Sequence, residues 1–187
     1  MKVRTLLHQI GMVAFMVIAF TLGVRALPAQ AQDSDAVSKL LVQAKSEAVL
    51  AEQDADLLHS YTMSKLSWQS HADKLAEIAD HINALGKLNK DLAEKRALGS
   101  AWQQKAVDQI DPLLKQMANQ LTATINHIKV NPTQVNRPAY REYTQANYEL
   151  ARKTAGMIRD FVDYDEAQSR AQSLEAKLEL SEPEKND

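Results

Sequence analysis

The amino-acid sequence predicts an all-α protein, folded as an antiparallel up-down four-helix bundle that follows an N-terminal signal peptide. The chain is rich in the better helix formers and has only five glycines and five prolines. Apolar residues recur at intervals of three and four along four long segments, and no run alternates as a strand would. Mostly short connections between these segments favour the up-down topology.

The first 31 residues have the order of a secretory signal peptide. Lys2 and Arg4 form a basic start, an apolar run covers residues 10–24, and Ala29 and Ala31 have the spacing of a cleavage site. An uncleaved membrane anchor is the alternative, although the uninterrupted apolar run is short for a membrane span. We therefore expect a periplasmic or secreted protein that meets a membrane only through this segment, and only if the segment is uncleaved.

Charge and cysteine content narrow the classes of function. Without residues 1–31 the chain keeps 19 basic and 24 acidic residues, a formal charge of −5, which argues against nucleic-acid binding. The sequence has no cysteine, so disulfides, thiol nucleophiles and covalently attached c-type haem are excluded. We expect one domain over residues 32–180, because about 150 residues suit a single core, and a disordered, solvated tail over 181–187.

The first helix is predicted to begin at Ser34 as its N-cap, with Asp35 in its first turn. A turn is expected near residues 61–67, because hydroxyl side chains recur between Leu58 and His71: Ser60, Thr62, Ser64, Ser67 and Ser70. A single unbroken helix over residues 35–98 is the alternative, since neither Gly nor Pro interrupts the pattern there. The apolar stripe of this first segment consists of Ala36, Val37, Leu40, Leu41, Ala44, Ala48, Ala51, Ala55 and Leu58.

The second and third helices carry coiled-coil-like seams. Gly99 is expected to end the second helix, and Ser100 to cap the third. Pro112 falls in phase with the third seam, so we expect a kink in one helix rather than a new helix capped by Asp111. The polar Asn89 and Thr124 are expected to fix helix register. The two seams are Leu75, Ile78, Ile82, Leu85, Asn89 and Leu92, then Val107, Ile110, Leu114, Met117, Leu121, Thr124 and Ile128.

The fourth helix follows the one obvious loop, residues 131–138, and Pro138 suits its first turn. Its pattern weakens beyond Asp165, so this last part is expected to extend past the bundle and to offer a partner-binding surface. The predicted core seam of the fourth helix is Tyr143, Leu150, Thr154, Met157, Phe161 and Tyr164.

Three histidines are predicted to gather at one end of the bundle. His71 and His127 each lie 28 positions from Gly99, the tip between the second and third helices, so they should stand at the same height. Folding the first helix back brings His59 to a similar level, whereas His81 should lie further along the bundle.

Such a cluster allows a metal or haem site made by His71, His127 and His59, with His81 as a further candidate. Zinc or copper would suit imidazole ligands, and bundles hold such sites between facing helices. However, the sequence contains neither Glu-x-x-His nor His-x-x-x-His. The favoured interpretation is structural: His71 and Trp68 close the end of the core, with their ring nitrogens bonded to backbone or water, and no cofactor is bound.

No catalytic motif stands out, so we predict that the protein is not an enzyme. No serine lies in a Gly-x-Ser-x-Gly setting, and no Gly-rich phosphate loop is present. The carboxylates that draw attention are interpreted as solvated helix faces: Asp108, Asp111, Asp160, Asp163, Asp165 and Glu166.

Three short stretches resemble a group of exported bacterial helical proteins to which no activity is attached. They are Ser67–His71 (SWQSH), Asn83–Lys87 (NALGK) and Asp160–Tyr164 (DFVDY), and the likeness covers most of residues 55–165. The resemblance implies export and a helical bundle, and it implies nothing about mechanism.

Together these features predict an exported, non-enzymatic helical bundle with an interaction or structural role in the cell envelope. Its partner would be an envelope protein or a second copy of the chain, and nucleic acid is not expected. The alternative is a metal- or haem-binding bundle that uses the histidine cluster. An envelope-stress chaperone is a third hypothesis, which rests only on small size, helicity and export.

Overall fold

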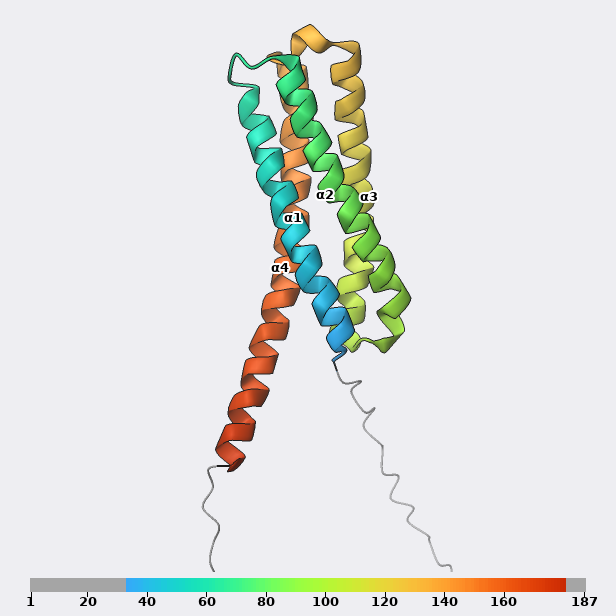
Figure 1. The fold of residues 1–187 in the computed structure, drawn as a ribbon, viewed down its shortest axis with the longest axis vertical. Coiled ribbons are helices and arrows are strands. Elements are labelled where there is room, and N and C mark those ends of the chain that lie inside the picture. Colours follow the sequence, from blue (N-terminus) through green and yellow to red (C-terminus); the bar gives the residue numbers. More distant parts are fainter. Residues whose placement is uncertain (1–32, 181–187) are drawn as a thin grey trace, which may run out of the picture.

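The computed structural model describes residues 33–180, and it confirms the all-α four-helix fold (Figure 1). The predicted signal peptide, residues 1–31, and the predicted tail, residues 181–187, lie outside the described residues. The elements are α1 (Asp35–Tyr61), α2 (Trp68–Lys95), the 3-10 turn η1 (Arg96–Leu98), α3 (Ala101–Val130), the 3-10 turn η2 (Pro132–Gln134) and α4 (Pro138–Leu180).

The helices run alternately up and down, and each packs against its neighbours in the chain (Figure 1). α4 returns to pack against α1, which closes the bundle around one core. The alternative of one helix over residues 35–98 is wrong, because residues 62–67 form a turn between α1 and α2. Ser67 caps α2, and its side chain accepts a hydrogen bond from the backbone N–H of Ser70 at 3.4 Å.

The predicted seams of the first three helices face the core, except that Ala36 is exposed and that Leu40 and Asn89 are only partly buried. In α1 the buried positions alternate by four and three, and the middle of the stripe is alanine, which lets neighbouring helices approach closely. In α3 the helix continues through Pro112, as expected. The buried residues of α1 are Val37, Leu41, Ala44, Ala48, Ala51, Ala55 and Leu58.

Polar pairs cross the interfaces between helices at the predicted seam positions. The Asn147 amide of α4 donates to Thr124 Oγ1 of α3 at 2.5 Å, and both side chains are buried. The Asn89 amide of α2 donates to Asp111 Oδ1 of α3 at 3.1 Å. Each of these hydrogen bonds forms at only one lengthwise alignment of its two helices. This agrees with the expectation that Asn89 and Thr124 fix helix register.

The predicted core seam of α4 is wrong by about one residue. Thr154 is buried, but Tyr143, Leu150, Met157 and Phe161 are only partly buried, and Tyr164 is 53% exposed. The smaller side chains one position away face the core instead, because they pack beside the alanine-rich face of α1. The buried residues of α4 are Tyr140, Thr144, Asn147, Ala151, Thr154, Ala155, Ile158 and Val162.

α4 extends past the other three helices at the end of the bundle where α1 begins (Figure 1). Val162 is still buried, whereas every residue from Ala171 to Leu178 is exposed. We call residues 166–180 the projecting end of α4. None of the helices within residues 33–180 is both long enough and apolar enough to cross a membrane.

Candidate functional site

The histidines at one end of the bundle meet around a tyrosine of α4. The ring of the fully buried Tyr140 lies 5.4 Å from that of His71 and 5.9 Å from that of His127, centroid to centroid. His71 also meets Tyr61 edge to face at 5.6 Å, and His127 meets Tyr143 at 4.8 Å. The equal height predicted for His71 and His127 is therefore confirmed.

His71 closes the core at this end, and Trp68 does not. The His71 side chain is 0% exposed, and neither of its ring nitrogens has a hydrogen-bond partner within residues 33–180, so the predicted bonds from these nitrogens to the backbone are wrong. Burial lowers the pKa of the His71 imidazole, because the charged form cannot be solvated there. Trp68 is 44% exposed, so its predicted place in the cap of the core is wrong.

The three histidines do not converge on one point. His59 Nδ1 lies 3.1 Å from Thr144 Oγ1, on the side of the bundle where α1 meets α4. The part of the chain that the structure describes contains no group of three or more His, Asp or Glu side chains arranged to hold a metal ion. His71 and His127 thus pack as rings against Tyr140, whereas His59 contacts Thr144.

A second polar cluster, which the sequence analysis did not anticipate, joins α1 to α2. His81 Nδ1 lies 2.8 Å from a Glu47 oxygen, and His81 Nε2 lies 3.4 Å from an Asp54 oxygen. Lys74 bonds Asp54 at 3.0 Å and also bonds Glu77. Desolvation is the largest single effect on the pKa of Lys74, and it lowers that pKa. The interactions with Glu77 and Asp54 together outweigh it, so the pKa is raised above its usual value. Lys74 and His81 of α2 thus tie the Glu47 and Asp54 carboxylates of α1 to the second helix.

The third feature is an apolar groove between α3 and α4, with a volume of about 680 Å³. It lies toward the end of the bundle from which α4 projects. Its apolar lining comes from three aromatic residues and Met157, and three of its four charged lining residues are basic. The lining residues are Trp102, Lys105, Gln109, Arg152, Lys153, Gly156, Met157, Asp160, Phe161 and Tyr164.

An aromatic wall gives the groove its shape. The Trp102 ring stacks on Phe161 at 6.5 Å and meets Tyr164 edge to face at 5.3 Å. The Trp102 indole N–H donates to Asp33 Oδ1 at 2.7 Å, which fixes the ring against the start of the described chain. At Gly156 a methyl group would meet no atom within 4 Å, so the absence of a side chain there leaves the groove open.

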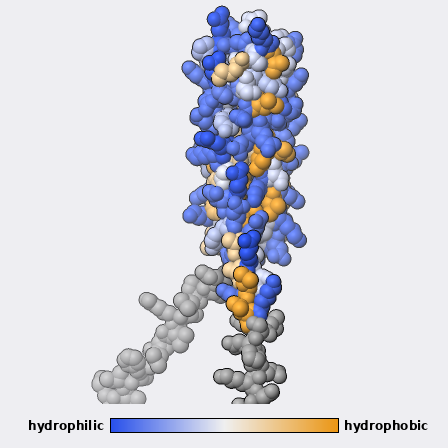
Figure 2. Space-filling view, turned by 90° about the vertical axis from the view of Figure 1, so that its left-hand side faces the viewer, coloured by the Kyte–Doolittle hydropathy of each residue, from blue (hydrophilic) through white to orange (hydrophobic). Residues whose placement is uncertain are grey.

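The apolar face of the groove continues onto the projecting end of α4. At 100° per residue, Tyr164, Ala167, Ala171 and Leu174 fall within an arc of roughly 80°. Met157, which lines the groove, falls about 20° outside the same arc. Leu174 is 54% exposed, and apolar atoms lie on the projecting end in Figure 2. Groove and projecting end therefore form one continuous strip along α4, which we call the α4 strip.

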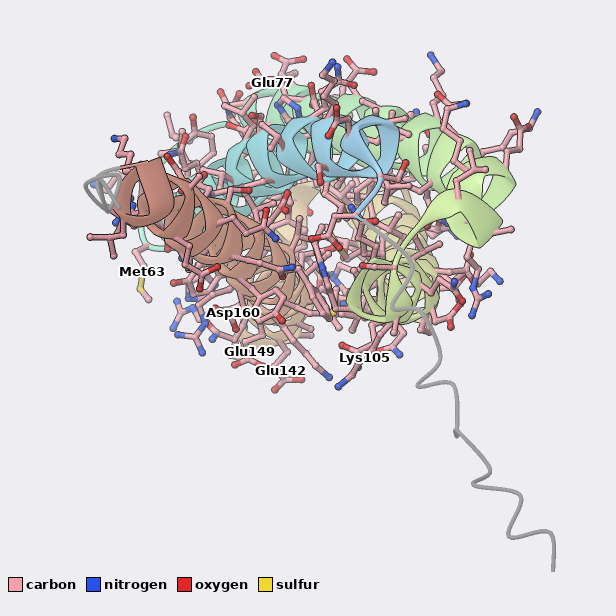
Figure 3. All side chains as sticks on the ribbon, turned by 90° about the horizontal axis from the view of Figure 1, so that it is seen from below. Met63, Glu77, Lys105, Glu142, Glu149 and Asp160 are labelled. Carbon is pink, nitrogen blue, oxygen red and sulfur yellow. The ribbon has the colours of Figure 1, made fainter. Side chains whose placement is uncertain are left out.

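Charged side chains lie both within and beside the α4 strip, because Lys153 and Asp160 fall inside the same arc. Lys105 of α3 and Asp160 of α4 lie on the same side of the bundle, opposite Glu77 (Figure 3). Arg152 and Lys153 add positive charge near the groove, and the Arg152 guanidinium sits 5.6 Å from the centre of the Tyr148 ring. The groove end of the strip is thus mainly basic.

Sequence reasoning missed the groove because it assigned Met157, Phe161 and Tyr164 to the core. Large apolar side chains at intervals of three and four are usually core residues, and only the three-dimensional packing of α4 shows Met157 and Phe161 partly buried and Tyr164 exposed. Trp102 at the start of α3, which is partly buried, gave no signal either, because a single tryptophan forms no periodic pattern in the sequence.

Comparisons with protein-family models, with curated proteins and with solved structures found no significant match. The resemblance to exported bacterial helical proteins therefore stays a prediction.

Proposed function

We propose that this protein is exported and serves as a non-enzymatic interaction or structural component of the cell envelope, with the α4 strip as its binding surface. The order of residues 1–31 supports export, because a basic start, an apolar run and Ala29-x-Ala31 together are typical of a signal peptide. The absence of a recognisable catalytic motif from the sequence supports a role in binding.

The observation that carries the proposal is the projecting end of α4. A free helix of this length is marginal in water, and the projecting end persists as an extension of a helix that the bundle nucleates. It displays Leu174 at 54% exposure in a segment that contributes nothing to the core of its own bundle. An exposed apolar stripe next to an aromatic groove is typical of a protein-binding surface.

Site-specific photo-crosslinking in living cells tests this role. The full chain is produced in a bacterium with a photoreactive amino acid at Leu174, or at Leu50 of α1 as the control. Leu50 is a suitable control because it is 43% exposed and lies on another helix. After irradiation, the cells are fractionated and the N-terminus of the protein is sequenced.

The expected result is a protein in the envelope or periplasmic fraction whose chain begins at Gln32, with a discrete adduct formed from position 174 and none from position 50. A chain that remains in the cytoplasm would contradict export. The same adducts from both positions, or none from either, would contradict the binding role of the α4 strip.

A further inference from the structure

We infer that the partner of the α4 strip is a second copy of this chain, paired antiparallel so that the projecting end of each copy lies along the groove of the other. The inference rests on the proposed binding role of the α4 strip and names its partner. It follows from the way in which the two halves of the strip complement each other in shape and in charge.

The groove half and the projecting half of the α4 strip match in shape when two copies of α4 lie side by side and antiparallel. The groove half is hollow, because Gly156 contributes no side chain, and Met157 lines it. The projecting half extends past the other three helices, and its residues from Ala171 to Leu178 are exposed (Figure 1). A two-fold axis across α4 near residues 165 and 166 places Leu174 of each copy against Met157 of the other, at the hollow.

The same register aligns the rest of the strip. Ala167 of one copy meets Tyr164 of the other, so a small side chain faces a large one close to the axis. The strip from Lys153 to Leu178 is about 38 Å long at 1.5 Å per residue. Because the pairing is isologous, each copy supplies both a projecting end and a groove, and the contact closes at two copies.

Charge complementarity favours this antiparallel register. It brings Arg170 of one copy to within about one residue of the level of Asp160 of the other, with Asp160 inside the strip and Arg170 beside it. Asp160 has no ion pair with any residue in the range 33–180.

Glu175 forms a second complementary contact, on the basic part of the groove. The register brings it to within about one helical turn of Lys153. Lys105 lies nearby as well. It comes about one helical turn after Trp102, whose ring stacks on Phe161, and α3 runs antiparallel to α4. In a parallel pairing of two α4 helices, equivalent residues would meet and like charges would face each other.

The mass of the protein in solution is the first test. Residues 32–187, which contain every described helix, are examined by light scattering during size exclusion at concentrations through the micromolar range, where interfaces of modest area associate. The expected mass is twice that of the chain. Leu174→Glu should raise the dimer dissociation constant at least tenfold, whereas the matched surface variant Leu50→Glu should leave it unchanged.

A cysteine pair tests the register, because the chain has no cysteine of its own. Leu174→Cys and Met157→Cys are made separately, mixed, and oxidised mildly. The mixture should form a linked species of twice the chain mass. Leu174→Cys alone should not, because its two copies of position 174 would stand about 25 Å apart. Arg170→Asp should weaken the dimer, and addition of Asp160→Arg should restore it.

A monomer at all concentrations, or a dimer insensitive to Leu174→Glu, would overturn the inference. Efficient linking of Leu174→Cys with itself would overturn the antiparallel register. Failure of the wider proposal would look different. If the protein is a monomer and position 174 crosslinks in cells to a protein of another mass, the α4 strip is a binding surface but not for a second copy. If the purified protein is a dimer but the chain remains in the cytoplasm of living cells, the envelope role is contradicted.

Discussion

Gln103 of α3 binds both backbone groups of Ser34 at the start of α1. Gln103 Oε1 accepts from the Ser34 N–H at 2.8 Å, and Gln103 Nε2 donates to the Ser34 carbonyl at 3.1 Å. The same amide oxygen accepts from the Ser100 N–H at 3.0 Å, and the amide nitrogen also donates to Ser38 Oγ at 3.0 Å. One fully buried side chain thus holds the beginnings of two helices together.

Replacing this glutamine should therefore cost more than replacing an exposed one on the same helix. Gln103→Leu removes the partners of the Ser34 and Ser100 N–H groups, and each buried group left unpaired costs about 1–3 kcal/mol. We expect the free energy of unfolding in urea to fall by at least about 2 kcal/mol. Gln116→Leu, at an exposed position of α3, should change it by less than about 0.5 kcal/mol. Equal effects of both variants would contradict this role of Gln103.

Acid should destabilise the bundle through His71. Its pKa in the folded state is lowered from 6.5 by burial, so below pH 6.5 the unfolded chain binds more protons than the folded one. The contribution of neutral His71 to stability is therefore complete above pH 6.5 and is lost as the pH falls from there toward the lowered folded-state pKa. Urea denaturation of the wild type at a series of pH values from 7.5 to about 5 measures this slope.

His71→Phe is the variant that isolates this effect. It keeps an aromatic ring between Tyr61 and Tyr140 and removes the titrating nitrogens. At pH 7.5 we expect a change in stability below about 1.5 kcal/mol, as for other swaps of similar volume in a core. Between pH 6.5 and 5 the variant should lose less stability than the wild type. An unchanged pH slope would show that His71 is not the group responsible.

Two glycines should respond to alanine in opposite directions. At Gly86, on the exposed face of α2, an added methyl group meets nothing within 4 Å. Gly86→Ala should therefore raise stability by about 0.5–1 kcal/mol through helix propensity. At Gly99 the methyl group would lie 3.0 Å from Gln103 Cβ, so Gly99→Ala should lower stability by about 1–3 kcal/mol. Thermal denaturation of the two variants compares these signs, and a stabilising Gly99→Ala would contradict the packing at that turn.

Deletion of residues 166–187 should leave the bundle folded. The described residues that it removes are nearly all exposed, and the core of α4 ends at Val162. Circular dichroism of residues 32–165 should give at least the helicity per residue of the longer chain, with a similar melting temperature. A marked loss of helicity per residue would mean that the projecting end supports the fold instead of serving a partner.

Elemental analysis and a visible spectrum of residues 32–187, purified without a histidine tag, test the metal and haem hypothesis. We expect substoichiometric zinc and copper and no Soret band, because His59 turns to Thr144 while His71 and His127 pack on Tyr140. Treatment with a chelator should then leave the melting temperature unchanged. Stoichiometric metal or haem that is lost in His71→Ala and His127→Ala would instead make the histidine end a functional site.

The sequence predicted the level of each residue along the bundle axis better than the direction in which its side chain points. Equal rise per residue on either side of Gly99 was enough to bring His71 and His127 to the same level. Their orientation depends on the rotation of each helix about its axis, which spacing along one helix does not define. The extra turn between α1 and α2 was also predictable, because the serines near residue 64 favour a turn over a helix.

The rotation of α4 shows the same limit in the core. Two adjacent faces of this helix both repeat at intervals of three and four, one with Met157 and Phe161 and the other with Ala155 and Ile158. Hydrophobicity alone favours the face with the larger residues. Packing beside the alanines of α1 favours the smaller one, because small side chains on both helices let the axes come close. The groove follows from that choice, so it could not be predicted before the fold was known.

Because α4 is long, the amide protons in its two parts should exchange with solvent in different ways. Around Ile158 the amide protons are shielded by the core, so they exchange with solvent deuterium only when the whole bundle opens. Near Leu174 no tertiary contact protects the backbone in the isolated bundle, and fraying from the C-terminus suffices. Exchange along α4 should therefore rise steeply after Val162, and occupation of the α4 strip would move that boundary toward the C-terminus.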